Sequence, residues 1–172
     1  MLRAFSRRQH EHGKSHISTQ LTATLHWWIE HLPSLPVRQV PCDLRNRPVV
    51  ISYSDGEGGN GQVGVALWRQ GQLHGLAGVI RVPSEIRARW NEKQKQARFN
   101  DIFEVEAIGP LLILENFESE LRDCVWLHFI DNAASLSALV RGSSSVLSGE
   151  QITGLTWCHI AGLSCYPWFN MS

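Results

Sequence analysis

The chain has 172 residues, of which 43% are hydrophobic and 19% are charged. These values are typical of one folded domain with a hydrophobic core, and they exclude a disordered chain or two domains of ordinary size. Sixteen basic residues balance sixteen acidic ones, so the net charge predicts no partner. A nucleic-acid-binding surface would therefore need local clustering of positive charge.

The first 47 residues differ from the remainder of the chain. Residues 1–17 are polar and predict a tail, and apolar residues at helical spacing predict a helix over Ser18–Leu32. Prolines end this helix and make Pro33–Pro48 an extended linker. We therefore expect residues 1–47 to be the tail, helix and linker of a preceding connection region, and residues 48–172 to form the main domain.

The main domain is predicted to begin with three antiparallel strands. Consecutive apolar β-formers predict a buried strand over Val49–Ser54, which delivers Asp55 to its C-terminal end. The glycines that follow are expected to end that strand and to let backbone or a ligand come close. A second strand is predicted over Val63–Arg69, and a hairpin turn at Gln70–Gln72 leads into a third strand over Leu73–Val82.

The next segment, Pro83–Asn100, is rich in basic residues. A positive patch with one aromatic side chain is typical of a surface that binds a phosphate backbone. A solvated amphipathic helix has the same composition, and composition alone favours that second interpretation. The candidate nucleic-acid-binding residues in this segment are Arg87, Arg89, Trp90, Lys93, Lys95 and Arg98.

A long apolar segment, Asp101–Phe117, predicts a helix that contains one obstacle. Pro110 is tolerated only near a helix start, so we expect the helix to begin near Glu106 or to kink there. That start would place the Glu106 carboxylate in or just before the first turn, where the helix dipole stabilises negative charge.

The last third of the chain contains a second buried strand, Cys124–Ile130, and it too ends in a carboxylate, Asp131. A small-residue helix is predicted over Ala133–Val140 and a last helix over Gly149–Leu163. The start of another strand follows at Cys165–Asn170.

Three carboxylates thus share one arrangement. If the two buried strands are parallel neighbours, Asp55 and Asp131 lie at one edge of the sheet, where open α/β sheets bind their ligands. Carboxylates clustered there with Glu106 cannot all stay ionised without a cation, and oxygen ligands select Mg²⁺ or Mn²⁺. Two such ions about 4 Å apart can activate a water molecule and stabilise the leaving oxygen in phosphodiester hydrolysis. Asp55, Glu106 and Asp131 are therefore the candidate catalytic and metal-binding residues.

The order strand–Asp, two strands, helix–Glu, strand–Asp resembles the ribonuclease H family, and most closely the ribonuclease H-like domain of retroelement (reverse transcriptase) polyproteins. The similar motifs are Ser54–Gly58, Glu106–Leu112 and Phe129–Gly142. The resemblance implies an α/β fold, with three antiparallel strands, then parallel strands, in a mixed sheet flanked by helices. It also implies two Mg²⁺ ions and cleavage of the RNA strand of an RNA–DNA hybrid. Asn132, within the third motif, joins the candidate nucleic-acid-binding residues.

The sequence departs from that family at one point. Family members carry a fourth acid after the fifth strand, whereas the only acid here after Asp131 is Glu150, which we expect in the loop before the last helix. We therefore expect a C-terminally truncated domain that lacks its last helix and has a weakened second metal site. A polymerase domain upstream is an expected partner in the parent polyprotein.

Two other functions are compatible with these residues. One is a catalytically silent ribonuclease H-like fold that only binds nucleic acid. The other is a DEDD-type 3′–5′ exonuclease, in which Glu57 of the Asp55-Gly56-Glu57 motif would be a ligand. No apolar run approaches the length of a membrane span, and the four cysteines lack the spacing of a zinc site. The sequence therefore predicts an intracellular protein, cytoplasmic or nuclear, with no membrane partner.

Overall fold

The computed structural model describes residues 22, 25–26, 29–30, 33, 41–93 and 101–172. The chain divides into two units, Met1–Gln39 and Val40–Ser172. In the first unit, residues 22, 25–26 and 29–30 are helical, and the other residues of the predicted helix Ser18–Leu32 lie outside the described part of the chain. The predicted domain boundary after residue 47 stays a prediction. No helix among the described residues is long and apolar enough to cross a membrane.

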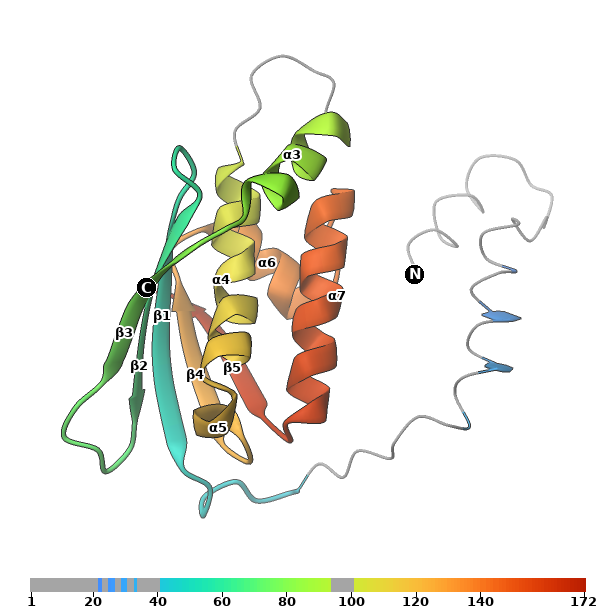
Figure 1. The fold of residues 1–172 in the computed structure, drawn as a ribbon. Coiled ribbons are helices and arrows are strands. Elements are labelled where there is room, and N and C mark those ends of the chain that lie inside the picture. The colour runs from blue at the N-terminus through green and yellow to red at the C-terminus, as the bar shows by residue number, and fades with distance from the viewer. Residues whose placement is uncertain (1–21, 23–24, 27–28, 31–32, 34–40, 94–100) are drawn as a thin grey trace. The chain divides into compact units, whose positions relative to one another are not determined.

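The Val40–Ser172 unit is built on a five-stranded mixed sheet with the strand order β3-β2-β1-β4-β5 (Figure 1). The strands are β1 (Val49–Glu57), β2 (Gln62–Arg69), β3 (Leu76–Arg81), β4 (Val125–Ile130) and β5 (Tyr166–Met171). The first three strands pair antiparallel, and β4 and β5 then extend the sheet from β1 in parallel. The predicted α/β fold, with three antiparallel strands followed by parallel ones, is confirmed.

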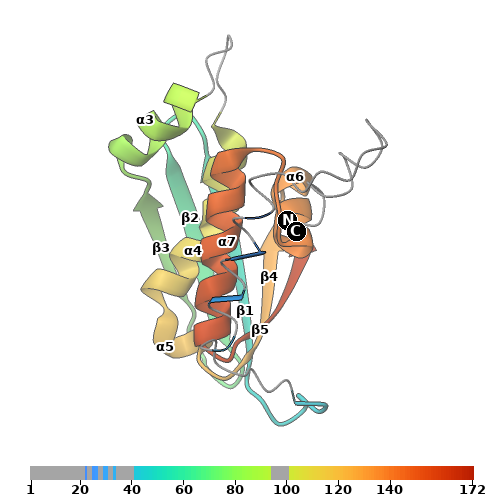
Figure 2. The ribbon, with the colours of Figure 1, turned by 90° about the vertical axis from the view of Figure 1, so that its right-hand side faces the viewer.

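Five helices accompany the sheet in this unit's described residues. They are α3 (Ser84–Lys93), α4 (Ile102–Asn116), α5 (Glu118–Leu121), α6 (Ala133–Arg141) and α7 (Leu147–Gly162). Figures 1 and 2 show α4 and α7 side by side on one face of the sheet, with α4 next to the sheet. The core lies between this helical layer and the sheet, because α4 packs on β1 and β2 while α6 packs on β4 and β5.

The side chains of β1 alternate strictly between the two faces of the sheet. Val50, Ser52 and Ser54 are buried beneath the helices, whereas Ile51 and Tyr53 are exposed on the opposite face. This alternation is what the two-residue period of a strand dictates.

The first strand continues further than the sequence predicts. Asp55, Gly56 and Glu57 remain in β1, where Asp55 pairs with Gly64 and Gly56 pairs with Val63 across the hairpin. The glycines therefore do not end the strand at residue 54. Pairing with β2 keeps the backbone extended. The absence of a side chain at Gly56 instead allows α4 to pack closely against β1, as described below.

The predicted start of α4 near Glu106 is also wrong, because the helix begins at Ile102 and contains Pro110. The first turn closes through a hydrogen bond of 2.9 Å from the Val105 N–H to the Asp101 carbonyl. Pro110 lies inside the helix and has no N–H to donate to the carbonyl of Glu106, four residues earlier. Because the helix begins at Ile102, Glu106 lies in its second turn rather than in its first.

Two other boundaries differ from the prediction. The third strand begins at Leu76 rather than Leu73, after a longer turn that includes Gly71 in the left-handed region with φ of 88°. The last helix begins at Leu147, so Glu150 lies in its first turn and not in the preceding loop. There the Glu150 carboxylate accepts a hydrogen bond of 2.8 Å from the Ser144 N–H and ties the preceding loop to the helix.

Candidate metal site

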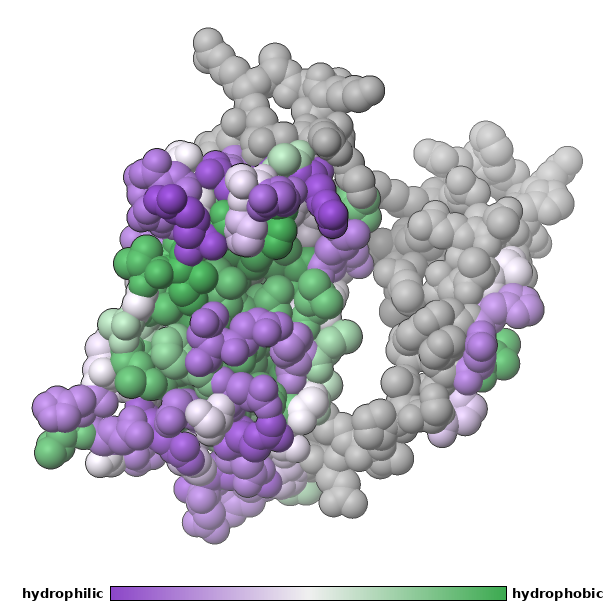
Figure 3. Space-filling model, in the orientation of Figure 1, coloured by the Kyte–Doolittle hydropathy of each residue, from purple (hydrophilic) through white to green (hydrophobic). Residues whose placement is uncertain are grey.

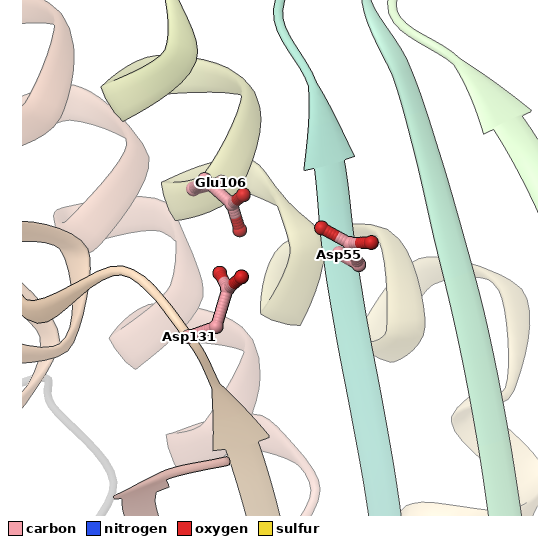
Figure 4. Close-up of side chains that lie close together, drawn as sticks. All are labelled: Asp55, Glu106 and Asp131. Carbon is pink, nitrogen blue, oxygen red and sulfur yellow. The ribbon is translucent and has the colours of Figure 1, made fainter.

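Three carboxylates converge at the C-terminal edge of the two central parallel strands. Asp55 comes from β1, Asp131 directly follows β4, and Glu106 projects from α4 (Figure 4). One oxygen from each of these side chains lies within 4.8 Å of the others. The structure thus brings together all three acids singled out in the sequence.

The strand register explains why the two aspartates meet. β1 and β4 are parallel neighbours, and their register pairs Ser54 with Ile130. The residue that follows each of this pair is an aspartate, so Asp55 and Asp131 lie side by side at the same level of the two strands. Both side chains are exposed to solvent at this edge.

A glycine brings the third carboxylate to the same place. The Gly56 N–H donates a hydrogen bond of 3.1 Å to Oε1 of Glu106. A Cβ atom added to Gly56 would lie only 3.0 Å from the backbone nitrogen of Glu106 and the carbonyl carbon of Val105. Only glycine therefore lets α4 approach β1 closely enough for this bond.

Glu106 is the buried acid of the cluster, and its pKa is raised. Its residue is 4% exposed, and its Oε2 atom is buried without a hydrogen-bond partner. Burial, and with it the charges of Asp131 and Asp55, raises the pKa of Glu106 from 4.5 to about 7, against the opposing Gly56 hydrogen bond. A buried carboxylate oxygen without a partner is costly.

A divalent cation fits this donor set. The three side chains offer only carboxylate oxygens, which are the ligands that Mg²⁺ and Mn²⁺ prefer. A cation between them would give Glu106 Oε2 a partner and would offset the repulsion among three negative charges. Asp55, Glu106 and Asp131 are therefore the residues that would hold such an ion.

Three other acids near the site have different roles. Glu57 accepts a hydrogen bond of 3.1 Å from the Asn60 amide, and Glu104 accepts one of 2.7 Å from the Ser148 hydroxyl. Glu150 bonds the Ser144 N–H of the loop before α7. Within residues 41–93 and 101–172, none of these three belongs to the acidic cluster.

Arg87, a predicted nucleic-acid contact, holds parts of the protein together. Its Nε donates a hydrogen bond of 2.6 Å to Oδ2 of Asp101, and its Nη2 donates one of 2.7 Å to the Gly58 carbonyl. The side chain thus joins α3 to the β1–β2 turn and to the residue before α4. Its charge is already paired with a carboxylate that is itself buried.

Asn132 is likewise engaged within the protein. Its Oδ1 atom accepts hydrogen bonds of 3.0 Å from the N–H groups of Ala134 and Ser135, so it caps α6. The cap fixes the direction in which the chain leaves Asp131. Its position next to the acidic cluster follows from the sequence, but this use of the amide oxygen does not.

The remaining candidates of the basic segment are placed only in part. Trp90 is 7% exposed and packs in the core, which leaves little ring surface for a base, whereas Arg89 is exposed. Both line a largely apolar groove of about 820 Å³ between α3, α4 and α7. Figure 3 shows hydrophobic residues below the hydrophilic surface of α3. Lys93 ends α3, and Lys95 and Arg98 lie outside the described residues.

Sequence reasoning indicates two features of this site only in part. The glycines after the first strand predict a close backbone approach, but not that α4 makes it at Gly56. His128 lies in an apolar run typical of a packed core histidine, and the structure buries it. Its hydrogen-bond partners, Ser52 and Ser54, were missed, although they alternate on the face opposite Tyr53.

No family model matches this chain, and no curated protein matches it. The family resemblance therefore depends on the order and spacing of the motifs and on the fold. The sheet order β3-β2-β1-β4-β5, with helices packed against the sheet, is compatible with a ribonuclease H-like fold. The acidic cluster lies at the edge of the sheet where that resemblance implies it.

Proposed function

We propose that this chain is a ribonuclease H-like, divalent-cation-dependent nuclease module that hydrolyses the RNA strand of RNA–DNA hybrids. One observation carries the proposal: the carboxylates of Asp55, Glu106 and Asp131 meet within 4.8 Å at the C-terminal edge of a mixed sheet. Three acids from three separate elements, one of them buried, indicate a built site rather than a solvated surface cluster.

The chemistry follows from the donor set. When bound, Mg²⁺ or Mn²⁺ would act as a Lewis acid in phosphodiester hydrolysis, and two ions are expected for this class of reaction. Asp55 and Asp131 reach into solvent and would meet the substrate side of the site. Glu106 would contribute its carboxylate from the buried side of the site. The Gly56 N–H fixes its Oε1, which leaves Oε2 for a cation.

The substrate and partners belong to the proposal as well. An RNA–DNA hybrid would approach the exposed aspartates, and Arg89 on α3 is the described basic side chain of the predicted segment that remains exposed. Arg87 would support this surface through its bonds to the β1–β2 turn rather than bind a phosphate itself. A retroelement origin, an upstream polymerase domain and an intracellular location complete the proposal.

One observation argues against the exonuclease alternative. That function would use Glu57 as a ligand, but Glu57 extends to Asn60 at the hairpin and is not part of the acidic cluster. The catalytically silent alternative has the same fold and the same acids. It differs only in its failure to cleave, so activity decides between the two.

The test is cleavage of a hybrid labelled in the RNA strand by the purified chain, with Mg²⁺, with Mn²⁺ and with EDTA. We expect metal-dependent cleavage of RNA that is lost in Asp55→Asn and retained in Glu57→Gln, a matched change of an acid two residues away. Cleavage by Asp55→Asn at the wild-type rate would refute the proposed role of Asp55. A folded wild-type chain that binds the hybrid without cleaving it would establish the silent alternative.

A further inference from the structure

A chain of polar side chains lies buried between β1, β4 and α4. Trp126 Nε1 donates a hydrogen bond of 2.7 Å to the Ser52 hydroxyl, and Ser52 Oγ lies 2.8 Å from His128 Nδ1. The other ring nitrogen, His128 Nε2, lies 3.1 Å from the Ser54 hydroxyl. His128 and Ser52 are fully buried, and Ser54 is 5% exposed. Buried polar groups linked in this way fix the relative positions of the elements that carry them.

The donors and acceptors have a consistent direction. The indole N–H can only donate, so Ser52 accepts from Trp126 and can direct its own hydrogen to Nδ1 of His128. Nε2 then carries the imidazole hydrogen and donates to Ser54. Burial lowers the pKa of His128 to about 3, so the ring is neutral at physiological pH and both of its nitrogens are used.

This bridge touches each element that bears a carboxylate of the site. Ser54 directly precedes Asp55 on β1, and His128 lies three residues before Asp131 on β4. The third element is in contact through Gly109, because a Cβ added there would overlap the Ser54 hydroxyl. Gly109 is one helical turn beyond Glu106 on α4. The Ser54 hydroxyl of β1 therefore contacts both β4, through His128, and α4, through Gly109, and so constrains the spacing of the three elements.

We propose that the Ser52–His128–Ser54 bridge positions the three carboxylates of the candidate metal site. The three residues touch no carboxylate of the cluster and act through the elements that carry it. They are positioning residues and take no part in the chemistry. The inference rests on the proposed cation site, whereas its first test needs no cation.

The first test measures hydrogen exchange of the Gly56 amide in the metal-free protein. That N–H bonds Glu106 Oε1, so its exchange reports how closely α4 lies to β1. We expect at least about tenfold faster exchange in Ser54→Ala and in His128→Leu, measured relative to amides of α7, because Ser54→Ala removes one buried hydrogen bond and His128→Leu removes two. Thr156→Val is the matched control, since it removes a buried hydroxyl bonded only within α7.

The second test measures Mn²⁺ binding to the same variants by electron paramagnetic resonance. We expect about tenfold weaker binding in Ser54→Ala and His128→Leu, and wild-type binding in Thr156→Val. Unchanged Gly56 exchange in both bridge variants, or unchanged Mn²⁺ affinity in folded bridge variants, would overturn the inference. A wild-type chain that binds no Mn²⁺ would instead refute the proposed function, and the exchange of Gly56 would still decide whether the bridge spaces the elements.

Discussion

Replacement of Glu106 by glutamine should stabilise the metal-free protein at neutral and alkaline pH. In the folded chain, burial and the neighbouring aspartates raise the pKa of Glu106 from 4.5 to about 7. The folded protein therefore retains a proton that the unfolded chain has already lost above pH 4.5. Stability falls as the pH rises between these two values, because there the folded state binds more protons than the unfolded state.

The size of this effect follows from the pKa difference. At about 1.4 kcal/mol for each pKa unit, the change from 4.5 to about 7 corresponds to roughly 3 kcal/mol. The site opens to solvent at the exposed Asp55 and Asp131, which screens part of the charge. We therefore expect Glu106→Gln to raise the free energy of unfolding by about 2 kcal/mol at pH 8 and by little at pH 4.

Urea unfolding in EDTA at a series of pH values from 4 to 8 measures this difference. Glu57→Gln is the matched control, because Glu57 lies two residues from Asp55 on the β1–β2 hairpin but outside the acidic cluster. The reasoning is refuted if the wild-type and Glu106→Gln stabilities run parallel across this range. Addition of Mg²⁺ at pH 8 should recover the lost stability in the wild type only, since a cation that binds the folded state stabilises it.

Three more predictions concern residues around the site. Gly56→Ala should weaken Mn²⁺ binding by at least about tenfold, because its Cβ would push α4 from β1, whereas Gly59→Ala, with open space around it, should bind as the wild type does. Arg87→Met should lower the free energy of unfolding, measured in urea, by about 2 kcal/mol, because it leaves the buried Asp101 carboxylate unpaired. The control Arg89→Met, at an exposed position, should change it by under about 0.5 kcal/mol. Equal losses in the two variants would contradict the role of the ion pair. Nitrogen-15 NMR of the histidine rings should find His128 neutral at pH 5, with its hydrogen on Nε2, and an imidazolium signal there would contradict the buried bridge.

The fold was predictable from the sequence because its strands carry strong signals. The runs Val49–Ser54 and Cys124–Ile130 are bounded and apolar, and each is followed by an aspartate. The cluster was predictable on the condition that these two strands are parallel neighbours, which the structure shows.

Tertiary contacts decided what local patterns could not. Pro110 argues for a late helix start on propensity alone, yet the helix begins at Ile102, and the Arg87–Asp101 pair holds the residue directly before it. The glycine at position 56 looks like a strand breaker, but its value lies in the approach of a distant helix. Such contacts join residues that are about 14 to 50 positions apart, so no window of sequence contains both partners.

The basic segment shows the same limitation for surface residues. Its basic residues and one tryptophan are compatible with a surface that binds a phosphate backbone and with a solvated helix, but Trp90 of α3 packs into the core. Composition does not reveal which side of a short helix faces inward when its apolar pattern is weak. Arg87, a predicted nucleic-acid contact, pairs with Asp101 of the same chain.

The most direct test of this account is an anomalous diffraction experiment on crystals soaked in Mn²⁺. We predict a peak bounded by the carboxylates of Asp55, Glu106 and Asp131, and its loss in Asp131→Asn. A well-ordered site without a peak at saturating Mn²⁺, or a peak elsewhere only, would contradict the claim that these three acids form a metal centre.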